Sequence, residues 1–139
     1  MSNNRFVWTG LEELKQELQQ LAPALVGEAS GIVDNAGEYA KSAVIQGYPL
    51  RTGDLRNHVV LTHFDAGKFG AAVILKNTAK HAWLFENGSE ARHTDLGADR
   101  GSMPPGHVFI PTVMRWRRWM WTELRALVER HGVTVTGEP

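Results

Sequence analysis

The chain contains no cysteine among its 139 residues. Disulfide bonds, thiolate chemistry and zinc sites built on cysteine are therefore excluded, and a reducing compartment fits this composition best. An excess of either charge is also missing, because fifteen Lys and Arg residues balance fifteen Asp and Glu residues. A protein that binds nucleic acid or an acidic membrane through most of its surface needs a positive net charge. The composition argues against both kinds of partner.

Long hydrophobic runs are missing as well. The first ten residues, MSNNRFVWTG, hold no apolar stretch of the kind that makes a signal peptide or a membrane anchor. We therefore expect neither, and no membrane partner. The length suits one domain, here 1–139, which can bury roughly two-thirds of the surface that the unfolded chain exposes.

The familiar motifs of active sites and metal sites are absent. The sequence has no HExxH, no GxSxG, no P-loop and no dinucleotide fingerprint, so we predict no catalytic residue, no metal and no cofactor. His81 and Glu86 are the most tempting acid–base pair, but five residues on a helix place them about 140° apart. We predict instead that Glu86 accepts hydrogen bonds from nearby backbone or from an arginine. His58 and His63 are predicted on one strand, pointing to opposite faces.

An apolar stripe predicts a long amphipathic helix in the first third of the chain. Thr9 and Glu12 form a capping box at its start, and the run from Gly47 to Pro49 ends it. Pro23 predicts a kink or break near residues 21–22. The stripe comprises Leu11, Leu14, Leu18, Leu21, Leu25, Ala29, Ile32, Val33, Ala36, Ala40 and Val44.

Two strands are predicted next, over 57–64 and 69–77, joined by a turn at 65–68. The first strand carries Val60 and Phe64 on one face and Val59 and Leu61 on the other. A sheet with one solvated face alternates more cleanly. We therefore expect both faces to be covered, either by helices of the same domain or by a neighbour.

The remaining elements complete an α+β domain in which a small antiparallel sheet packs with three helices. A short helix is predicted over 79–87, with Trp83 and Leu84 facing the sheet, and a long flexible loop over 89–107. A C-terminal helix follows, with Pro111 in its first turn and Gly132 as its C-cap. The final VTVT could add a short strand.

The stretch RWRRWMW at 115–121 is rich in tryptophan and arginine. A core-facing stripe of the C-terminal helix passes through it, and both residue types are enriched at the energetic centres of protein interfaces. We favour core plus protein interface, and keep nucleic-acid binding by base stacking as the alternative. The segment 111–131 is basic and the segment 10–47 is acidic. These are either two solvated faces or two surfaces that meet across a subunit contact.

Four segments in this order resemble a known family. They are GLEEL at 10–14, YPLRTGDLR at 48–56, NTAKHAWLFENGS at 77–89 and PPGHVFIP at 104–111. Together they are similar to the head–tail joining and tail-completion proteins of long-tailed bacteriophages, the neck or minor tail family. The resemblance covers about residues 6–130, with His81 where the family often has tyrosine.

The resemblance implies a structural protein of the virion and no enzyme. It implies helices flanking a small antiparallel sheet, and assembly of copies into a ring, six being one option, in the neck or at the end of the tail tube. Connector and tail-tube proteins are the expected partners, and genomic DNA is expected only in passage. Our candidate interface residues are Trp83, Phe85, Glu86, Arg92, Arg100, Arg115, Trp116, Arg118, Trp119 and Trp121.

Overall fold

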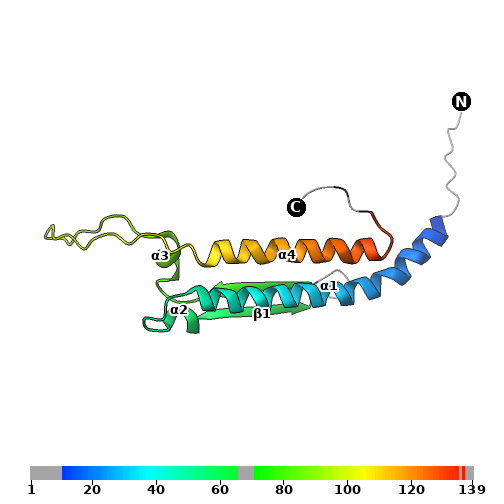
Figure 1. Ribbon diagram of the computed structural model, residues 1–139, viewed down its shortest axis with the longest axis horizontal. Helices are drawn as coiled ribbons and strands as arrows, with labels where there is room; N and C mark the ends of the chain where they lie inside the picture. Colours follow the sequence, from blue (N-terminus) through cyan, green and yellow to red (C-terminus); the bar gives the residue numbers. More distant parts are fainter. Residues whose placement is uncertain (1–10, 66–70, 135, 137–139) are drawn as a thin grey trace, which may run out of the picture.

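The computed structural model describes residues 11–65, 71–134 and 136 of the chain. The elements in chain order are α1 (Leu11–Gly47), α2 (Asp54–Asn57), β1 (Val59–Asp65), β2 (Ala71–Asn77), α3 (Ala82–Asn87) and α4 (Phe109–Arg130). This arrangement confirms the predicted α+β fold. Figure 1 shows an elongated molecule in which α1 and α4 run side by side and the strands lie along α1. The capping box predicted at Thr9 lies outside the described residues.

Helix α1 is continuous through Pro23, so the predicted break does not occur. Proline removes one backbone N–H and its ring crowds the carbonyl four residues earlier, which a helix can relieve by bending. Figure 1 shows the N-terminal part of α1 turning away from the line of the rest. The prediction of a break was wrong, and the alternative of a bend agrees with this view.

The middle of α1 contacts the sheet on one side and α4 on the other. Gly37 faces the sheet so closely that a Cβ atom there would lie 3.0 Å from Val73 and 3.1 Å from Leu61. On the other side, Tyr39 meets the rings of Trp116 and Trp119, with centroid distances of 5.2 and 5.5 Å. Helix α1 is thus the central layer between the sheet and α4.

The sheet is a two-stranded antiparallel hairpin that α1 covers on one face. Leu61 pairs with Leu75 and His63 pairs with Val73, and these residues face the helix. The strand begins at Val59, so His58 precedes it, and the prediction that both histidines share a strand was wrong. The predicted turn falls largely on residues 66–68, outside the described residues.

Helix α4 matches its prediction closely. Pro111 lies in the first turn, where its missing N–H costs little, and Gly132 follows the helix with φ 84°. Two members of the core-facing stripe, Leu127 and Trp116, are fully and partly buried, and Trp119 beside the stripe also contacts Tyr39 of α1. The suggested final strand does not form at Val133 or Thr134, and part of it lies outside the described residues.

The core is thin. Among the described residues eight apolar side chains are buried, whereas eleven large apolar side chains are classed as exposed. Single exposed apolar residues are ordinary in folded proteins. Here, however, the exposed large apolar side chains outnumber the buried apolar ones, and their contact with water costs free energy. The buried residues are Ala36, Ala40, Val44, Tyr48, Leu55, Val59, Ala79 and Leu127.

Candidate functional site

Three of the four family-like segments meet at one end of the molecule, around Tyr48. This side chain is 2 % exposed and packs in the core with Val44 and Leu55. Phe85 of α3 makes an edge-to-face contact with the Tyr48 ring at 5.5 Å. Val108, just before α4, packs against the same cluster. We call the contacts among segments 48–56, 77–89 and 104–111 the motif junction.

Polar contacts fix the first of these segments. The Arg56 guanidinium donates from Nε and Nη2 to the backbone carbonyl of Tyr48, with the Nε contact at 2.8 Å. Asn77 donates to the Leu55 carbonyl at 2.9 Å. Burial raises the pKa of the Tyr48 hydroxyl, against the effect of its hydrogen bond with Asn77. These contacts hold the short helix α2, Asp54–Asn57, which the sequence pattern did not predict.

Glu86 holds the start of α4. Its carboxylate accepts the backbone N–H groups of Val108 at 3.0 Å, Phe109 at 2.9 Å and Ile110 at 2.8 Å. These N–H groups have no partner within a helix, and a carboxylate there also complements the helix dipole. Glu86 is only 7 % exposed. The prediction that it accepts backbone hydrogen bonds is confirmed.

His81 and Glu86 do not form a pair. The His81 ring lies 3.5 Å from the carboxylate of Asp54, and Asp54 also contacts His58 at 3.1 Å. Glu86 is turned to α4 instead, so no proton lies within reach of both His81 and Glu86. No group of three or more His, Asp or Glu residues within the described ranges is placed to hold a metal ion.

Two glycines allow the backbone to close around α3. A Cβ atom on Gly88, whose φ is 76°, would lie 2.6 Å from the Met103 carbonyl oxygen. A Cβ atom on Gly106 would lie 2.5 Å from the Phe85 ring, and the Gly106 N–H donates to the Phe85 carbonyl at 2.7 Å. Only glycine fits either position without displacing its neighbours. The backbone segment that leaves α3 and the segment that leads back to α4 therefore lie in close contact.

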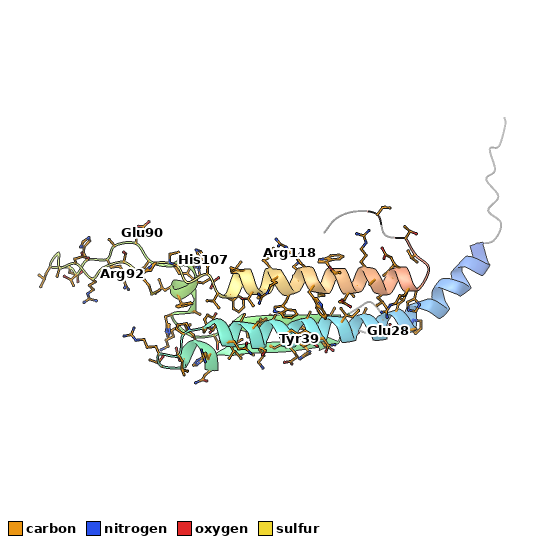
Figure 2. All side chains as sticks on the ribbon, in the orientation of Figure 1. Glu28, Tyr39, Glu90, Arg92, His107 and Arg118 are labelled. Atoms are coloured by element: carbon orange, nitrogen blue, oxygen red, sulfur yellow. The ribbon has the colours of Figure 1, made fainter. Side chains whose placement is uncertain are left out.

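Between these glycines, residues 89–103 form a long hairpin, which we call the arm. Backbone hydrogen bonds join Ser89 to Met103 and Arg92 to Gly101, and a turn at 94–98 closes the tip. Figure 1 shows the arm projecting from α3, away from the helices and the sheet. Figure 2 shows Glu90 and Arg92 on it. The predicted loop is therefore a paired arm whose apolar tip residue, Leu96, is 98 % exposed.

A groove lies at the base of the arm. It encloses about 510 Å³ between the segment 49–55, α3 and the first part of the arm. Its apolar wall includes Leu84, Phe85 and Met103. Arg51 and Arg92 also line it, and neither forms an ion pair among the described residues. The groove thus combines an apolar wall with two arginines and the carboxylate of Asp54, which contacts His58 and His81.

The second face of the sheet is open. Strand β1 presents Val60 and Phe64 there, and β2 presents Ile74. Phe64 is 48 % exposed and Ile74 is 51 % exposed. No helix among the described elements covers this face, which we call the open sheet face. The described helices thus cover one face of the sheet and leave this one exposed, so the expected cover on both faces is found on one face only within the described residues.

The predicted interface residues divide into internal and external ones. Phe85 and Glu86 belong to the motif junction of their own chain. Trp116 and Trp119 stack with Tyr39 between α4 and α1, and the buried Trp116 Nε1 has no hydrogen-bond partner among the described residues.

The other predicted residues are at the surface. Arg115 and Arg118 are exposed on α4, as Figure 2 shows for Arg118, and so is Trp121; Arg92 and Arg100 are exposed on the arm.

Trp83 does not face the sheet, and that prediction was wrong. Its side chain is 70 % exposed. Ala82 and Phe85 pack against the core, and Glu86 turns to α4. Trp83 follows Ala82 by one position, which rotates it about 100° around the helix. It lines a second, more open hollow of about 530 Å³ beside Pro105.

Comparisons of the chain with models of protein families, with curated proteins and with solved structures find no match. None of the helices among the described residues combines the length and the apolar character needed to cross a membrane.

Proposed function

We propose that this chain is a structural protein of the bacteriophage neck or tail, which completes the tail or joins it to the head through protein–protein contacts. The observation that carries the proposal is the motif junction. Segments that are far apart in sequence, and that carry the family resemblance, pack on one another around Tyr48 and Glu86. Residues of the family-like segments thus stabilise the fold itself, which suits a structural protein.

The surface supports the same proposal. The open sheet face, Trp83 and Leu96 together present large apolar side chains on three separate parts of the molecule. The open sheet face groups three of these side chains, and an exposed apolar patch often marks a protein–protein contact. Subunits of a virion would cover them, and copies of this chain in a ring, six being one option, would cover some of them. Assembly would then take place in the host cytoplasm and end in the virion.

Deletion of the coding sequence from the phage genome that carries it tests the proposal. We expect filled heads and separate tails to accumulate, and complementation with the intact chain to restore joined particles. Purified chain should also bind the connector or tail-tube proteins of the same genome. Complete and infectious particles without the chain, together with no binding to either protein, would refute the proposal.

A nucleic-acid-binding module is the second candidate, and the outer face of α4 favours it. Arg115, Arg117 and Arg118 are exposed there, near the partly exposed Trp121. However, two of the three tryptophans of this stretch, Trp116 and Trp119, are partly buried against Tyr39, which leaves less of their surface for contact with bases. Filter binding at low salt distinguishes the candidates, because a nucleic-acid module binds tightly and loses affinity steeply as salt is added.

A further inference from the structure

The arm tip and the groove at the arm base have complementary chemistry. The turn at the tip contains Asp95, Leu96 and Asp99 and no basic residue between positions 94 and 99. Leu96 makes almost no contact with its own chain, since it is 98 % exposed. The groove offers an apolar wall with Arg51 and Arg92 beside it. The two carboxylates and the apolar side chain of the tip complement the two arginines and the apolar wall of the groove, whose lining also includes Asp54.

The tip cannot enter the groove of its own chain. Ser89, Arg92 and Met103 line the groove, and the same residues belong to the two branches of the arm. Figure 1 shows the arm running away from this base. An extended branch from Ser89 to Leu96 reaches on the order of 20 Å at about 3.3 Å per residue. This reach is long enough for the tip to contact a second molecule.

We propose that the groove of one copy binds the arm tip, residues 94–99, of a second copy. Leu96 would pack against the apolar wall of the groove, beside Leu84 and Phe85. Asp95 and Asp99 would face Arg51 and Arg92. A groove of about 510 Å³ is within the range of pockets that enclose an apolar group with its flanking backbone. The contact joins two different surfaces, so repetition produces a closed ring or an open filament.

This inference deepens the proposed function and rests on it for the setting in which copies meet. It adds the segment that each copy donates and the surface that receives it. A contact through an arm also explains why the arm is paired along its length: a preformed hairpin loses less conformational entropy on binding than a disordered loop does.

Cysteine cross-linking tests the contact, because the natural chain has no cysteine. One variant carries Leu96→Cys and a second, tagged variant carries Thr52→Cys in the groove. We expect mild oxidation of the mixture to give covalent dimers that contain both variants. The matched control replaces Thr52→Cys with Thr122→Cys, an exposed threonine on α4. Equal yields of mixed dimers in the two mixtures, or none in either, would overturn the proposal.

A non-covalent measurement complements the cross-link. Sedimentation of the full chain should show self-association that Leu96→Ser or Asp95→Lys weakens about tenfold or more. Glu90→Lys makes the same charge change elsewhere on the arm and should leave association unchanged. All of these side chains are exposed, so thermal melting should confirm that each variant folds. Unchanged association in both tip variants would contradict the proposed contact.

The two proposals fail separately. If tip variants still associate normally while particles lacking the chain remain unjoined, the arm contact is wrong and the structural role stands. If the tip and the groove cross-link specifically while particles without the chain are complete and infectious, the contact stands and the virion role is wrong.

Discussion

Glu86 Oε1 accepts the backbone N–H of Ile110 at 2.8 Å, although 24 positions separate the two residues in the chain. The other oxygen of the same carboxylate accepts the N–H groups of Val108 and Phe109. One side chain of a six-residue helix thus fixes where a 22-residue helix begins. The contact also brings together the two ends of the arm.

Replacing Glu86 should destabilise the fold. Glu86→Ala leaves three N–H groups at the start of α4 without their acceptor, and we expect a loss of about 2 kcal/mol or more in the free energy of unfolding. Glu86→Gln keeps one acceptor oxygen and should lose about half as much. Urea denaturation measures both, with Glu90→Ala on the arm as control, expected within about 0.5 kcal/mol of the natural chain. A loss as small in Glu86→Ala as in the control would contradict the capping role.

Two glycines of α1 should respond differently to alanine. Gly31 has open space around the position of a Cβ atom, so Gly31→Ala should stabilise the helix by roughly 0.5–1 kcal/mol. At Gly37 the added methyl group meets Val73 and Leu61 of the sheet, and the packing strain should cancel this gain or exceed it. Thermal unfolding of the two variants measures this difference in stability. A Gly37→Ala variant as stable as Gly31→Ala would show that α1 does not pack closely on the sheet.

The contact between β1 and α1 should depend on pH. His63 Nδ1 lies 2.8 Å from Asp34 and its Nε2 lies 3.4 Å from Glu38, while its cross-strand neighbour is Val73. The hydrogen bond with Asp34 raises the pKa of His63. The protonated ring therefore contributes stability that is fully present below the unfolded pKa, about 6.5, and is lost as the pH rises through the folded pKa.

Denaturation midpoints between pH 5 and pH 8 measure this effect. The natural chain should lose stability over the upper part of that range, and His63→Gln should show a smaller loss. Added salt should reduce the difference, because all three side chains are exposed to solvent. His93→Gln, on the arm, serves as the control. Identical pH profiles for His63→Gln and the natural chain would rule out the contribution.

The open sheet face should matter for binding more than for folding. Phe64→Ser and Ile74→Ser change side chains that are half exposed, so the free energy of unfolding should shift by less than about 1 kcal/mol. Under the proposed function, binding to connector or tail-tube proteins should weaken tenfold or more. Leu50→Ser, a more exposed leucine outside the sheet, is the matched control. Undiminished binding by both sheet variants would show that no partner covers this face.

The sequence predicted the main elements because their patterns are local. The stripe of α4, its proline in the first turn and the glycine after its end all lie within one segment, and each was confirmed. The predicted break at Pro23 was wrong because the presence of a proline does not by itself distinguish a helix that bends from one that ends. The helix α2 was missed because its four residues depend on contacts that Arg56 and Asn77 make elsewhere.

The site was harder to predict than the fold. Counting helical positions correctly separated His81 from Glu86, but it could not show which face of α3 is buried. That choice depends on Tyr48, which lies more than thirty positions earlier, and it turned Trp83 outward. The groove could not be predicted at all, because its lining comes from three segments that meet only in the folded chain.

The close contact between the segment that leaves α3 and the segment that leads back to α4 has a mechanical consequence. Both branches of the arm emerge there, between Gly88 and Gly106, directly beside the carboxylate that holds the first turn of α4. Tension applied to the arm would act first on these few hydrogen bonds and would spare the long helix pair behind them. Under such a load we expect local opening at the arm base before the packing of α1 against α4 is disturbed.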